Sequence, residues 1–293
     1  FWYGYPYRAG PEFSMSLVDL HLHSTFSDGV YTPAQLVEQA AAARLTVVAL
    51  TDHDTLNGIP EFFAAGAKAG LQVIPGVELG SQAGDASVHI LGYGVRPDNE
   101  PLLTNMLRLR HARETRLQKI LGKLKEHGIV VQVEECDPRN RAVGRPHVAK
   151  AMVAKGYVQG VQEAFDKYLG RGKPCYVPQP KLTPLEAVHL IHGAGGLAVL
   201  AHPEEVGDRA LLTQIFAGVP LDGLEVYHPS ARNVPGAYAF WQDFAAARGK
   251  FYTGGSDFHG HADRYPRHLG EFAVQSEWLE LYWQQPVIKN FLR

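Results

Sequence analysis

Short apolar runs that lead into histidine, aspartate or glutamate recur along the chain, and helical patterns separate them. Val18–Leu22 leads to His23, and Leu197–Ala201 leads to His202. Thr46–Leu50 is a third such run. Runs of this length and β-branched content predict buried strands. Strand–helix–strand units that repeat at this interval predict a parallel sheet with right-handed crossovers, and therefore an α/β protein.

The helices and the remaining strands of this α/β pattern have their own signals. Thr32-Pro33-Ala34-Gln35 and Thr183-Pro184-Leu185-Glu186 each place Thr as N-cap, Pro first and Gln or Glu third, which predicts helix starts. Leu102 to His127 has one apolar stripe and predicts a long amphipathic helix. Further strands are expected at Gln72–Ile74, Ser87–Leu91, Gly223–Tyr227 and Phe251–Ser256.

The first strand carries a His-x-His pair. Side chains two apart on a strand point to the same side, so His21 and His23 project together, with Asp19 one step behind. Two imidazoles on a rigid strand make half of a metal site. Asp28 follows in a Ser-Asp-Gly turn, where its carboxylate can fold back toward them.

Candidate ligands recur at the C-terminal ends of the expected strands. In parallel barrels the chemistry lies there, because the loops converge on one mouth. Nine such residues in phase are better explained by metal binding than by core packing. Without thiolates, the set suits Mn, Zn or Fe. The nine are His21, His23, Asp28, His53, Glu78, His89, His202, Asp257 and His259.

The charge is unevenly distributed along the 293 residues. The segment 99–176 has 15 Lys and Arg against 8 Asp and Glu, whereas the rest has 13 against 22. A basic insertion in an acidic body fits metal-binding carboxylates in the body and a cationic cover for an anionic substrate. We therefore expect 15–98 and 177–293 to form the catalytic domain, and 99–176 to form a helical, substrate-binding cap.

The ordered motifs resemble those of the PHP (polymerase and histidinol phosphatase) family. They are His-x-His with Ser-Asp-Gly, Thr-Asp-His at 51–53, Gly-Val-Glu at 76–78, His-Ile at 89–90, Ala-His-Pro at 201–203 and Ser-Asp-Phe-His at 256–259. The resemblance implies a distorted (β/α)7 barrel with a trinuclear metal site, with Mn expected and Zn, Fe or Mg as alternatives. It assigns one ion to His21, His23, Glu78 and Asp257, a second to Glu78, His89 and His202, and a third to Asp28, His53 and His259.

The insertion resembles the TrpH or RNase AM branch of that family. The similar stretches are Gly144–Ala149, Lys167–Leu169 and Gly172–Val177. Members of that branch remove phosphate from nucleoside 3′,5′-bisphosphates or trim short RNA from its 5′ end. This chain departs from the pattern after His-Pro, where relatives often have Gly-Arg and it has Glu204-Glu205. A phosphate contact is therefore in doubt.

The expected reaction is hydrolysis of a phosphate ester of a nucleotide or short RNA. Two ions that share Glu78 would hold a bridging hydroxide that attacks phosphorus. The residues assigned to catalysis are Glu78, His228 and Asp257. Arg145 and Lys173 would clamp phosphate, and His147 and His228 would bind it or protonate the leaving group. Asp52 and Asp54 would orient His53 or its neighbours.

Three other functions stay open. A small phosphomonoester such as histidinol phosphate needs the same chemistry, but a basic insertion argues against so small a substrate. A noncatalytic metal-binding domain is disfavoured by the complete ligand set. An amidohydrolase acting on C–N bonds would call for a lysine bridge at a strand end, and none is apparent.

The remaining features set the cellular context. Residues 1–14 lack the layout of a signal peptide and are interpreted as an N-terminal arm or a vector-derived remnant. Cys136 and Cys175 do not form a disulfide framework, which favours a reducing cytoplasm. No run is long and apolar enough to span a membrane. The sequence shows no sign of an obligate protein partner.

Overall fold

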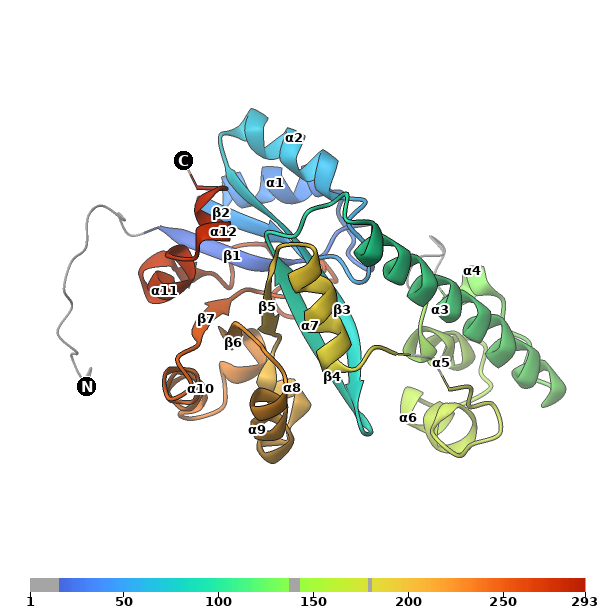
Figure 1. Cartoon of the computed structure of the whole chain (residues 1–293). Helices are drawn as coiled ribbons and strands as arrows, with labels where there is room; N and C mark the ends of the chain where they lie inside the picture. Colours follow the sequence, from blue (N-terminus) through green and yellow to red (C-terminus); the bar gives the residue numbers. More distant parts are fainter. Residues whose placement is uncertain (1–15, 137–142, 179–180, 293) are drawn as a thin grey trace.

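The computed structural model describes residues 16–136, 143–178 and 181–292, and its centre is one curved sheet (Figure 1). The strands follow the order β7-β6-β5-β4-β3-β2-β1-β8. Leu22 in β1 also bridges to Phe258 just beyond β7, so the row closes on itself as a distorted barrel. The strands are β1 (Leu17–Leu22), β2 (Leu45–Leu50), β3 (Gln72–Ala83), β4 (Ala86–Tyr93), β5 (Leu197–Leu200), β6 (Gly223–Tyr227), β7 (Phe251–Gly254) and β8 (Val274–Gln275).

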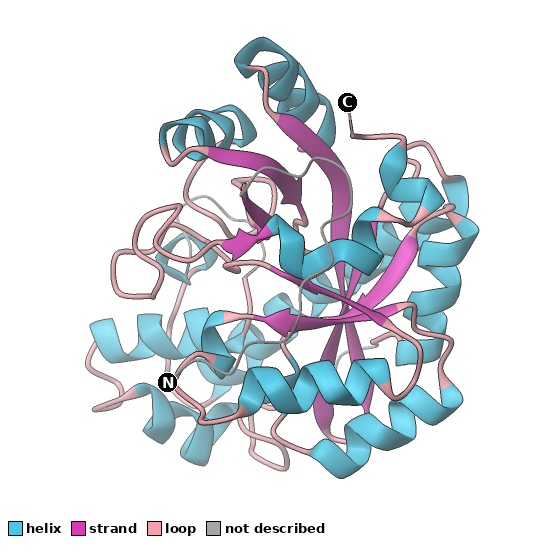
Figure 2. Cartoon of the chain, turned by 90° about the vertical axis from the view of Figure 1, so that its left-hand side faces the viewer, coloured by secondary structure: helices cyan, strands magenta, loops and turns pink. Residues whose placement is uncertain are grey.

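The strands are buried on both faces because helices surround them (Figure 2). In β1 only the first residue is exposed, and β6 is buried throughout. This explains why both read as nearly continuous apolar runs in the sequence. A charged side chain in such a strand has to point into the barrel and find a partner there.

The barrel is distorted because β4 runs antiparallel to both β3 and β5. Gly84-Asp85 joins β3 to β4 as a hairpin, with Ala83 paired to Ala86. A two-residue connection leaves no room for a crossover helix. The expectation of an all-parallel sheet was therefore wrong at β4. The expected strand at Gln72–Ile74 is also longer than predicted, so Glu78 lies inside β3 and His89 inside β4.

The long helices lie where the sequence predicts them. Both predicted capping boxes are present, at Thr32 and Thr183. The helices of the barrel region are α1 (Pro33–Ala42), α2 (Ile59–Ala69), α7 (Pro184–Gly193), α8 (Pro203–Val206), α9 (Arg209–Gly218), η2 (Pro229–Ala231), α10 (Ala237–Ala246), η3 (Ser276–Leu279), α11 (Glu280–Trp283) and α12 (Pro286–Lys289). The sequence analysis did not predict β8 or the helices after it.

Helix α3 (Glu100–Glu126) joins two hydrophobic cores. Leu102, Met106 and Leu109 pack into the core of the barrel. Leu117 and Leu124 belong to a second, smaller core. The other helices of that smaller core region are α4 (Val133–Cys136), α5 (Arg145–Ala154), α6 (Val161–Ala164) and the π-helical turn η1 (Phe165–Leu169). Figure 1 shows this helical group to the side of the barrel, at the far end of α3.

Two further expectations concern membrane spans and the N-terminal residues. No helix within 16–136, 143–178 and 181–292 is long and apolar enough to cross a membrane. The predicted N-terminal arm, residues 1–14, lies outside the described residues.

Candidate metal centre

Glu78 is the point on which the predicted ligands converge. Its side chain is 1% exposed, and both of its oxygens face imidazole nitrogens. Oε1 lies 2.7 Å from Nδ1 of His89 and 3.0 Å from Nε2 of His202. Oε2 lies 3.1–3.2 Å from a ring nitrogen of each of three further residues, His21, His23 and His53. One buried carboxylate therefore faces five imidazoles, which come from β1 and the residue after it, from β4 and from the turns after β2 and β5.

Asp257 completes a first group of ligand atoms with the His-x-His pair. Its Oδ1 lies 3.4 Å from Nε2 of His21 and 3.1 Å from Nε2 of His23. Asp257 follows β7, and the Leu22–Phe258 bridge holds this segment against β1. His21, His23, Glu78 and Asp257 each offer one ligand atom within 4.8 Å of the others.

A second group surrounds Asp28. Its Oδ1 lies 3.2 Å from Nε2 of His259, and its Oδ2 lies 3.8 Å from Nε2 of His53. His23 joins these three within the same 4.8 Å limit. A third set of that kind contains His53, Glu78 and His89. The structure thus brings all nine predicted ligands to one place.

Asp52 and Asp54, which were predicted to orient His53 or its neighbours, bind segments next to the predicted ligands. Asp52 accepts hydrogen bonds from the backbone and hydroxyl of Ser24 (2.7 and 2.6 Å) and from the hydroxyl of Ser27 (2.5 Å). It therefore holds the loop that carries Asp28. The carboxylate of Asp54 pairs with Arg113, so it ties helix α3 to the turn that carries His53.

Glu225 binds two of the predicted ligands, and the sequence analysis did not single it out. Its Oε1 accepts a hydrogen bond from Nδ1 of His21 (2.9 Å), which leaves Nε2 of that ring for the centre. Its Oε2 accepts the backbone N–H of His202 (2.8 Å). A carboxylate that fixes the tautomer of a ligand histidine is a usual outer partner in metal sites. A signal was available, because Glu225 is the single charged residue of a fully buried strand.

The charges of the centre depend on one another. Burial opposes ionisation of Glu78, but the imidazoles of His53, His89 and His21 hold its pKa well below the usual value. Burial likewise opposes the charged form of His23, yet Asp257 and Glu78 raise its pKa to about 10. Each charged form is therefore stable only because its opposite lies beside it.

The donor set fits divalent cations. Nε2 of His23 lies 3.1 Å from oxygens of Glu78 and Asp257 without a hydrogen bond to either. Oδ1 of Asp28 is also buried without a hydrogen bond. Nitrogen and oxygen atoms that converge in this way suit a metal ion better than one another. The residues present therefore fit bound metal.

The predicted substrate residues lie in three different settings. Nη1 of Arg145 donates to the carbonyl of Leu169 (3.1 Å), and its guanidinium lies 5.5 Å from the ring centres of Phe165 and Tyr176. Nδ1 of His147 accepts the backbone N–H of Gly144 (3.1 Å), which is a helix-capping contact. Lys173 lies on an exposed loop.

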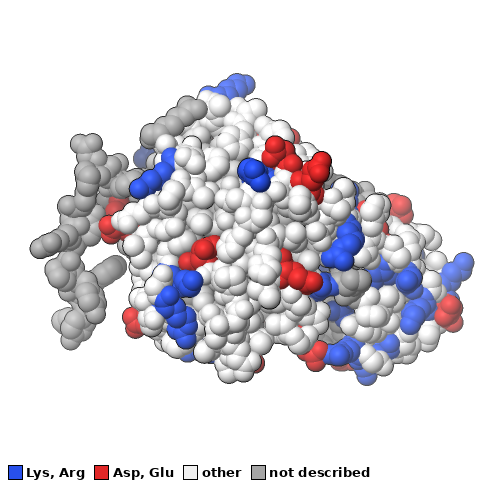
Figure 3. All heavy atoms as spheres, in the orientation of Figure 1, with Lys and Arg blue, Asp and Glu red and all other residues white. Residues whose placement is uncertain are grey.

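Arg145 belongs to a cluster of cations between the cap and the barrel. Burial lowers the pKa of Arg116, and so does the neighbouring charge of Arg145. Burial also lowers the pKa of Lys181, with further contributions from Arg116 and Arg145. Figure 3 shows many Lys and Arg side chains over the helical insertion. We call Arg113, Arg116, Arg145 and Lys181 the cap cations.

His228 faces the metal centre from the end of β6. Its Nδ1 accepts the backbone N–H of Ser230 (3.1 Å), so the neutral ring carries its proton on Nε2. That Nε2 is buried without a hydrogen bond and lies 3.7 Å from Oδ2 of Asp257. His228 can therefore present a donor to a ligand at the centre.

The two glutamates after His202-Pro203 have different surroundings. Glu204 accepts hydrogen bonds from Nε1 of Trp241 (2.8 Å) and from Arg209 (3.1 Å), so it serves packing. Glu205 faces the centre, with an oxygen 3.6 Å from Nδ1 of His202. Only the second residue of the pair therefore changes the charge of the site.

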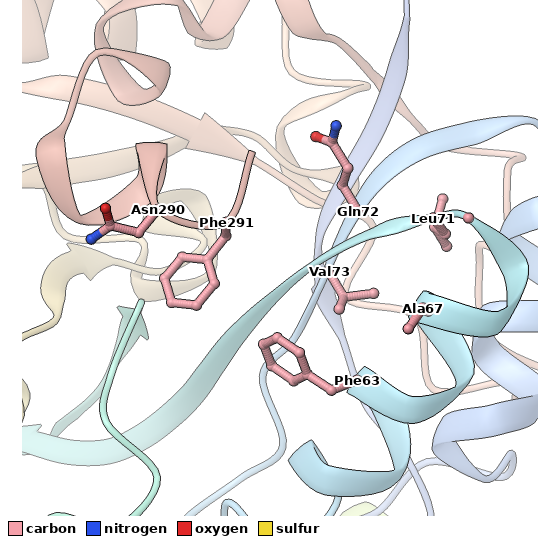
Figure 4. A pocket seen from close by; sticks show the side chains of 9 residues that line it. Phe63, Ala67, Leu71, Gln72, Val73, Asn290 and Phe291 are labelled. Carbon is pink, nitrogen blue, oxygen red and sulfur yellow. The ribbon is translucent and has the colours of Figure 1, made fainter. Parts of the chain in front are cut away.

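A hollow elsewhere on the barrel lacks the chemistry of the metal centre. It has a volume of about 250 Å³ between α2, the start of β3 and the C-terminal residues Asn290 and Phe291 (Figure 4). Its lining contains Phe63, Leu71 and Val73 and no titratable side chain. We therefore place the functional site at the metal centre.

Comparison with known proteins agrees with this geometry. The model of the PHP domain matches residues 19–168. A 3′,5′-nucleoside bisphosphate phosphatase of Chromobacterium violaceum is 34% identical over 253 residues, which are 84% of this chain and 88% of the relative. The 5′-3′ exoribonuclease Rnm of Escherichia coli is 33% identical over 83% of this chain and 85% of its own length.

A solved structure is similar over almost the whole chain. It belongs to a Bifidobacterium adolescentis protein described as a candidate metal-dependent phosphoesterase. The TM-score is 0.74 at 31% identity, and the match covers 91% of this chain and 95% of the other. The similarity therefore includes the helical insertion as well as the barrel.

Proposed function

The chain belongs to the PHP domain family, in its TrpH and RNase AM branch, and from this premise we propose that it is a metal-dependent phosphoesterase acting on nucleotides or short RNA. The observation that carries the proposal is the convergence of five imidazoles on both oxygens of Glu78. A single buried carboxylate in this position suits the bridge between two cations. Phosphate esters are the substrates named for the relatives.

We propose three divalent ions per chain, with Mn as the expected metal. The donor set of imidazoles and carboxylates without thiolate favours Mn, Zn or Fe. His21, His23, Glu78 and Asp257 would hold the first ion. Glu78, His89 and His202 would hold the second, and Asp28, His53 and His259 the third. Bound ions would supply Lewis acidity, which activates water and polarises the phosphoryl group.

The chain's own residues would orient the ligands and move the proton. Glu225 fixes the tautomer of His21, and Asp52 fixes the loop of Asp28. The Nε2 proton of His228 points toward the centre, within reach of Asp257. As a neutral ring, His228 would hold a phosphate oxygen through that N–H; to protonate the leaving oxygen it would first have to gain a second proton, on Nδ1.

The helical segment 99–176 would act as the substrate-binding cap. Its Arg113, Arg116 and Arg145, with Lys181 from the returning chain, concentrate positive charge beside the barrel. A guanidinium binds phosphate as a two-pronged donor, so these cations suit a second phosphate or the backbone of RNA. Lys173 would contribute from its exposed loop at longer reach.

The cellular setting follows from the chemistry of the cysteines and the substrates. Cys136 and Cys175 are both free thiols. Free thiols and nucleotide substrates are compatible with the cytoplasm, which we propose as the location. The proposal requires no protein partner.

A panel of phosphate esters tests the function. Protein reloaded with Mn should release phosphate fastest from a nucleoside 3′,5′-bisphosphate or remove nucleotides from short 5′-phosphorylated RNA. Preference for histidinol phosphate over both would favour the small-phosphomonoester alternative. Absence of hydrolysis across the panel, at full metal occupancy, would contradict a phosphoesterase and favour a noncatalytic metal-binding domain.

A further inference from the structure

A pocket of about 430 Å³ opens beside the metal centre, on the side of β6 and β7. Its floor includes His228 and Ser256, which adjoin Asp257. Its walls carry two arginines, Arg232 and Arg264. The hydroxyl of Ser230 and the amide of Asn233 add hydrogen-bond donors, and Glu205 contributes a carboxylate to the same lining.

Arg264 reaches from this pocket to the reacting centre itself. Its Nη2 lies 2.5 Å from Oδ2 of Asp257, and its Nη1 lies 3.3 Å from Nδ1 of His259. Asp257 turns its other oxygen, Oδ1, toward His21 and His23. The same carboxylate can therefore serve the metal ligands with Oδ1 and hold the guanidinium with Oδ2.

Arg264 also accounts for a fourth group of ligand atoms. Glu205, His228 and Asp257 each offer one atom within 4.8 Å of the others, which on its own would suit another metal ion. The guanidinium of Arg264 already contacts Oδ2 of Asp257 as the cation of this group. Glu205 lies close enough for its charge to act on Arg264. The carboxylates of Asp257 and Glu205 therefore act as counter-ions that hold the guanidinium of Arg264 in place.

The contact with Asp257 leaves part of the Arg264 guanidinium available to a ligand. The Arg264 side chain is 44% exposed, and it lines the pocket. A guanidinium has five N–H donors in a fixed fork, more than its contacts with Asp257 and His259 use. Arg232 is held differently, because its guanidinium stacks 4.2 Å from the ring centre of Tyr265.

We propose that Arg264 binds a nonbridging oxygen of the reacting phosphate group, and that the pocket it lines receives that phosphate. The proposal rests on the phosphoesterase function proposed above. Glu205 has the role of a counter-ion for Arg264 and does not bind substrate. The cap cations then hold a different part of the substrate, on the side of α3.

The test measures phosphate binding separately from turnover. Inorganic phosphate is titrated by calorimetry into Mn-loaded wild type, Arg264→Ala, Arg264→Lys and Arg248→Ala, with elemental analysis of each protein. Arg248 is the control, because it is an exposed arginine that follows α10, where its guanidinium stacks on the ring of Phe244 and donates to the Phe244 carbonyl. The same four proteins are assayed on an aryl phosphate and on a nucleoside 3′,5′-bisphosphate.

Arg264→Ala should bind phosphate about 10- to 150-fold more weakly, as expected for one charge-assisted contact. Its kcat/KM should fall in the same proportion on both substrates, because both contain the reacting phosphate. Arg264→Lys should recover part of the loss, since the charge stays and the fork is gone. Arg248→Ala should match wild type.

Three results would overturn the assignment. Phosphate affinity of Arg264→Ala within twofold of wild type would exclude the contact. A loss confined to the bisphosphate would place Arg264 at a remote group of the substrate. A loss of bound metal together with activity would make Arg264 a positioning residue for Asp257. If wild type binds phosphate but hydrolyses no ester, the phosphoesterase proposal fails and the affinity comparison still judges Arg264.

Discussion

Glu78 is the residue at which burial and ionisation oppose each other most strongly. A carboxylate removed from water is unfavourable unless positive charge surrounds it. Here the surrounding charge comes from imidazoles, and divalent ions would replace their protons. Glu78 therefore affects both the folding stability of the metal-free protein and the metal binding of the loaded protein.

Glu78→Gln should leave the fold intact and lower turnover by roughly 10²-fold or more, because an amide is a poor bridge between two cations. Elemental analysis and kcat on one substrate check this together. His192→Gln is a suitable control, since that histidine pairs with Asp222 away from the centre. Turnover near the wild-type rate at full metal occupancy would refute a bridging role.

The raised pKa values of three predicted ligands predict a proton count. Nearby carboxylates outweigh burial, and they raise the pKa of His21 well above its usual value, that of His23 to about 10 and that of His202 to about 9. All three rings are therefore protonated in metal-free protein at pH 7, and ligation must remove those protons. Loading Mn at pH 7 should release about three protons per chain. Calorimetric titrations in buffers of different ionisation enthalpy measure this number, and zero release would contradict it.

The same shifts give the pH dependence of stability. A group whose pKa is raised by folding stabilises the native state fully below its unfolded value, near 6.5 for histidine. That contribution is lost as pH rises through 9 to 10. Metal-free protein should therefore melt at a lower temperature at pH 10 than at pH 7. An unchanged melting temperature over this range would show that these imidazoles are not charged in the folded state.

At the scale of elements, the contact between the end of β7 and β1 shapes the centre. A Cβ added at Gly255 would lie 2.4 Å from the backbone nitrogen and the Cβ of His21. Only a glycine lets the two segments approach so closely. The positions of His21 and Asp257 thus depend on a residue that contributes no functional group.

Gly255→Ala should destabilise the protein by about 1–3 kcal/mol, the usual effect of overpacking, and should weaken metal binding as well. Gly122→Ala is the matched control, because nothing lies within 4 Å of the added Cβ. In the interior of α3 that change should be neutral or stabilising by about 0.5–1 kcal/mol. Equal effects of the two changes on denaturant unfolding would contradict the account.

The helices and strands also show which parts of the structure could be predicted from the sequence. Most of the nine predicted ligands follow short apolar runs, so local pattern was enough to select side chains that the structure brings close together. Their role as metal ligands stays a prediction. The direction of β4 was missed, although Gly84-Asp85 is a hairpin signal between two strand patterns. Arg264 was missed although Asp257 lies only seven residues before it, because a single arginine in a loop forms no recognisable pattern. Glu225 was missed because its partners lie elsewhere in the chain. Glu225 is 204 residues from His21, and no spacing rule connects the two.

At the scale of the whole molecule, charge distinguishes the segment proposed to bind substrate from the region that carries the predicted metal ligands. The segment 99–176 is basic and the remainder is acidic, although the net charge is only -2. Helix α3 packs into both cores, and its Arg113 pairs with Asp54 beside the metal ligands. The cap is therefore anchored directly to the centre that it is proposed to serve.

Arg145→Ala should lower kcat/KM on a nucleoside 3′,5′-bisphosphate by about 10- to 150-fold and spare an aryl phosphate, which lacks a second anionic group. Lys150→Ala, an exposed position on the same helix, controls for the loss of a surface charge. A proportional loss on both substrates would place Arg145 at the reacting phosphate. No loss on either would remove the cap from substrate selection.

The central claim is that the convergent ligands make this chain a metal-dependent phosphoesterase. The most direct measurement follows phosphate release from a nucleoside 3′,5′-bisphosphate while metal-stripped protein is titrated with Mn. We expect no release without metal, and a rate that rises with Mn and saturates at about three bound ions per chain. Phosphate release that is independent of metal, or no release at full occupancy, would contradict the account.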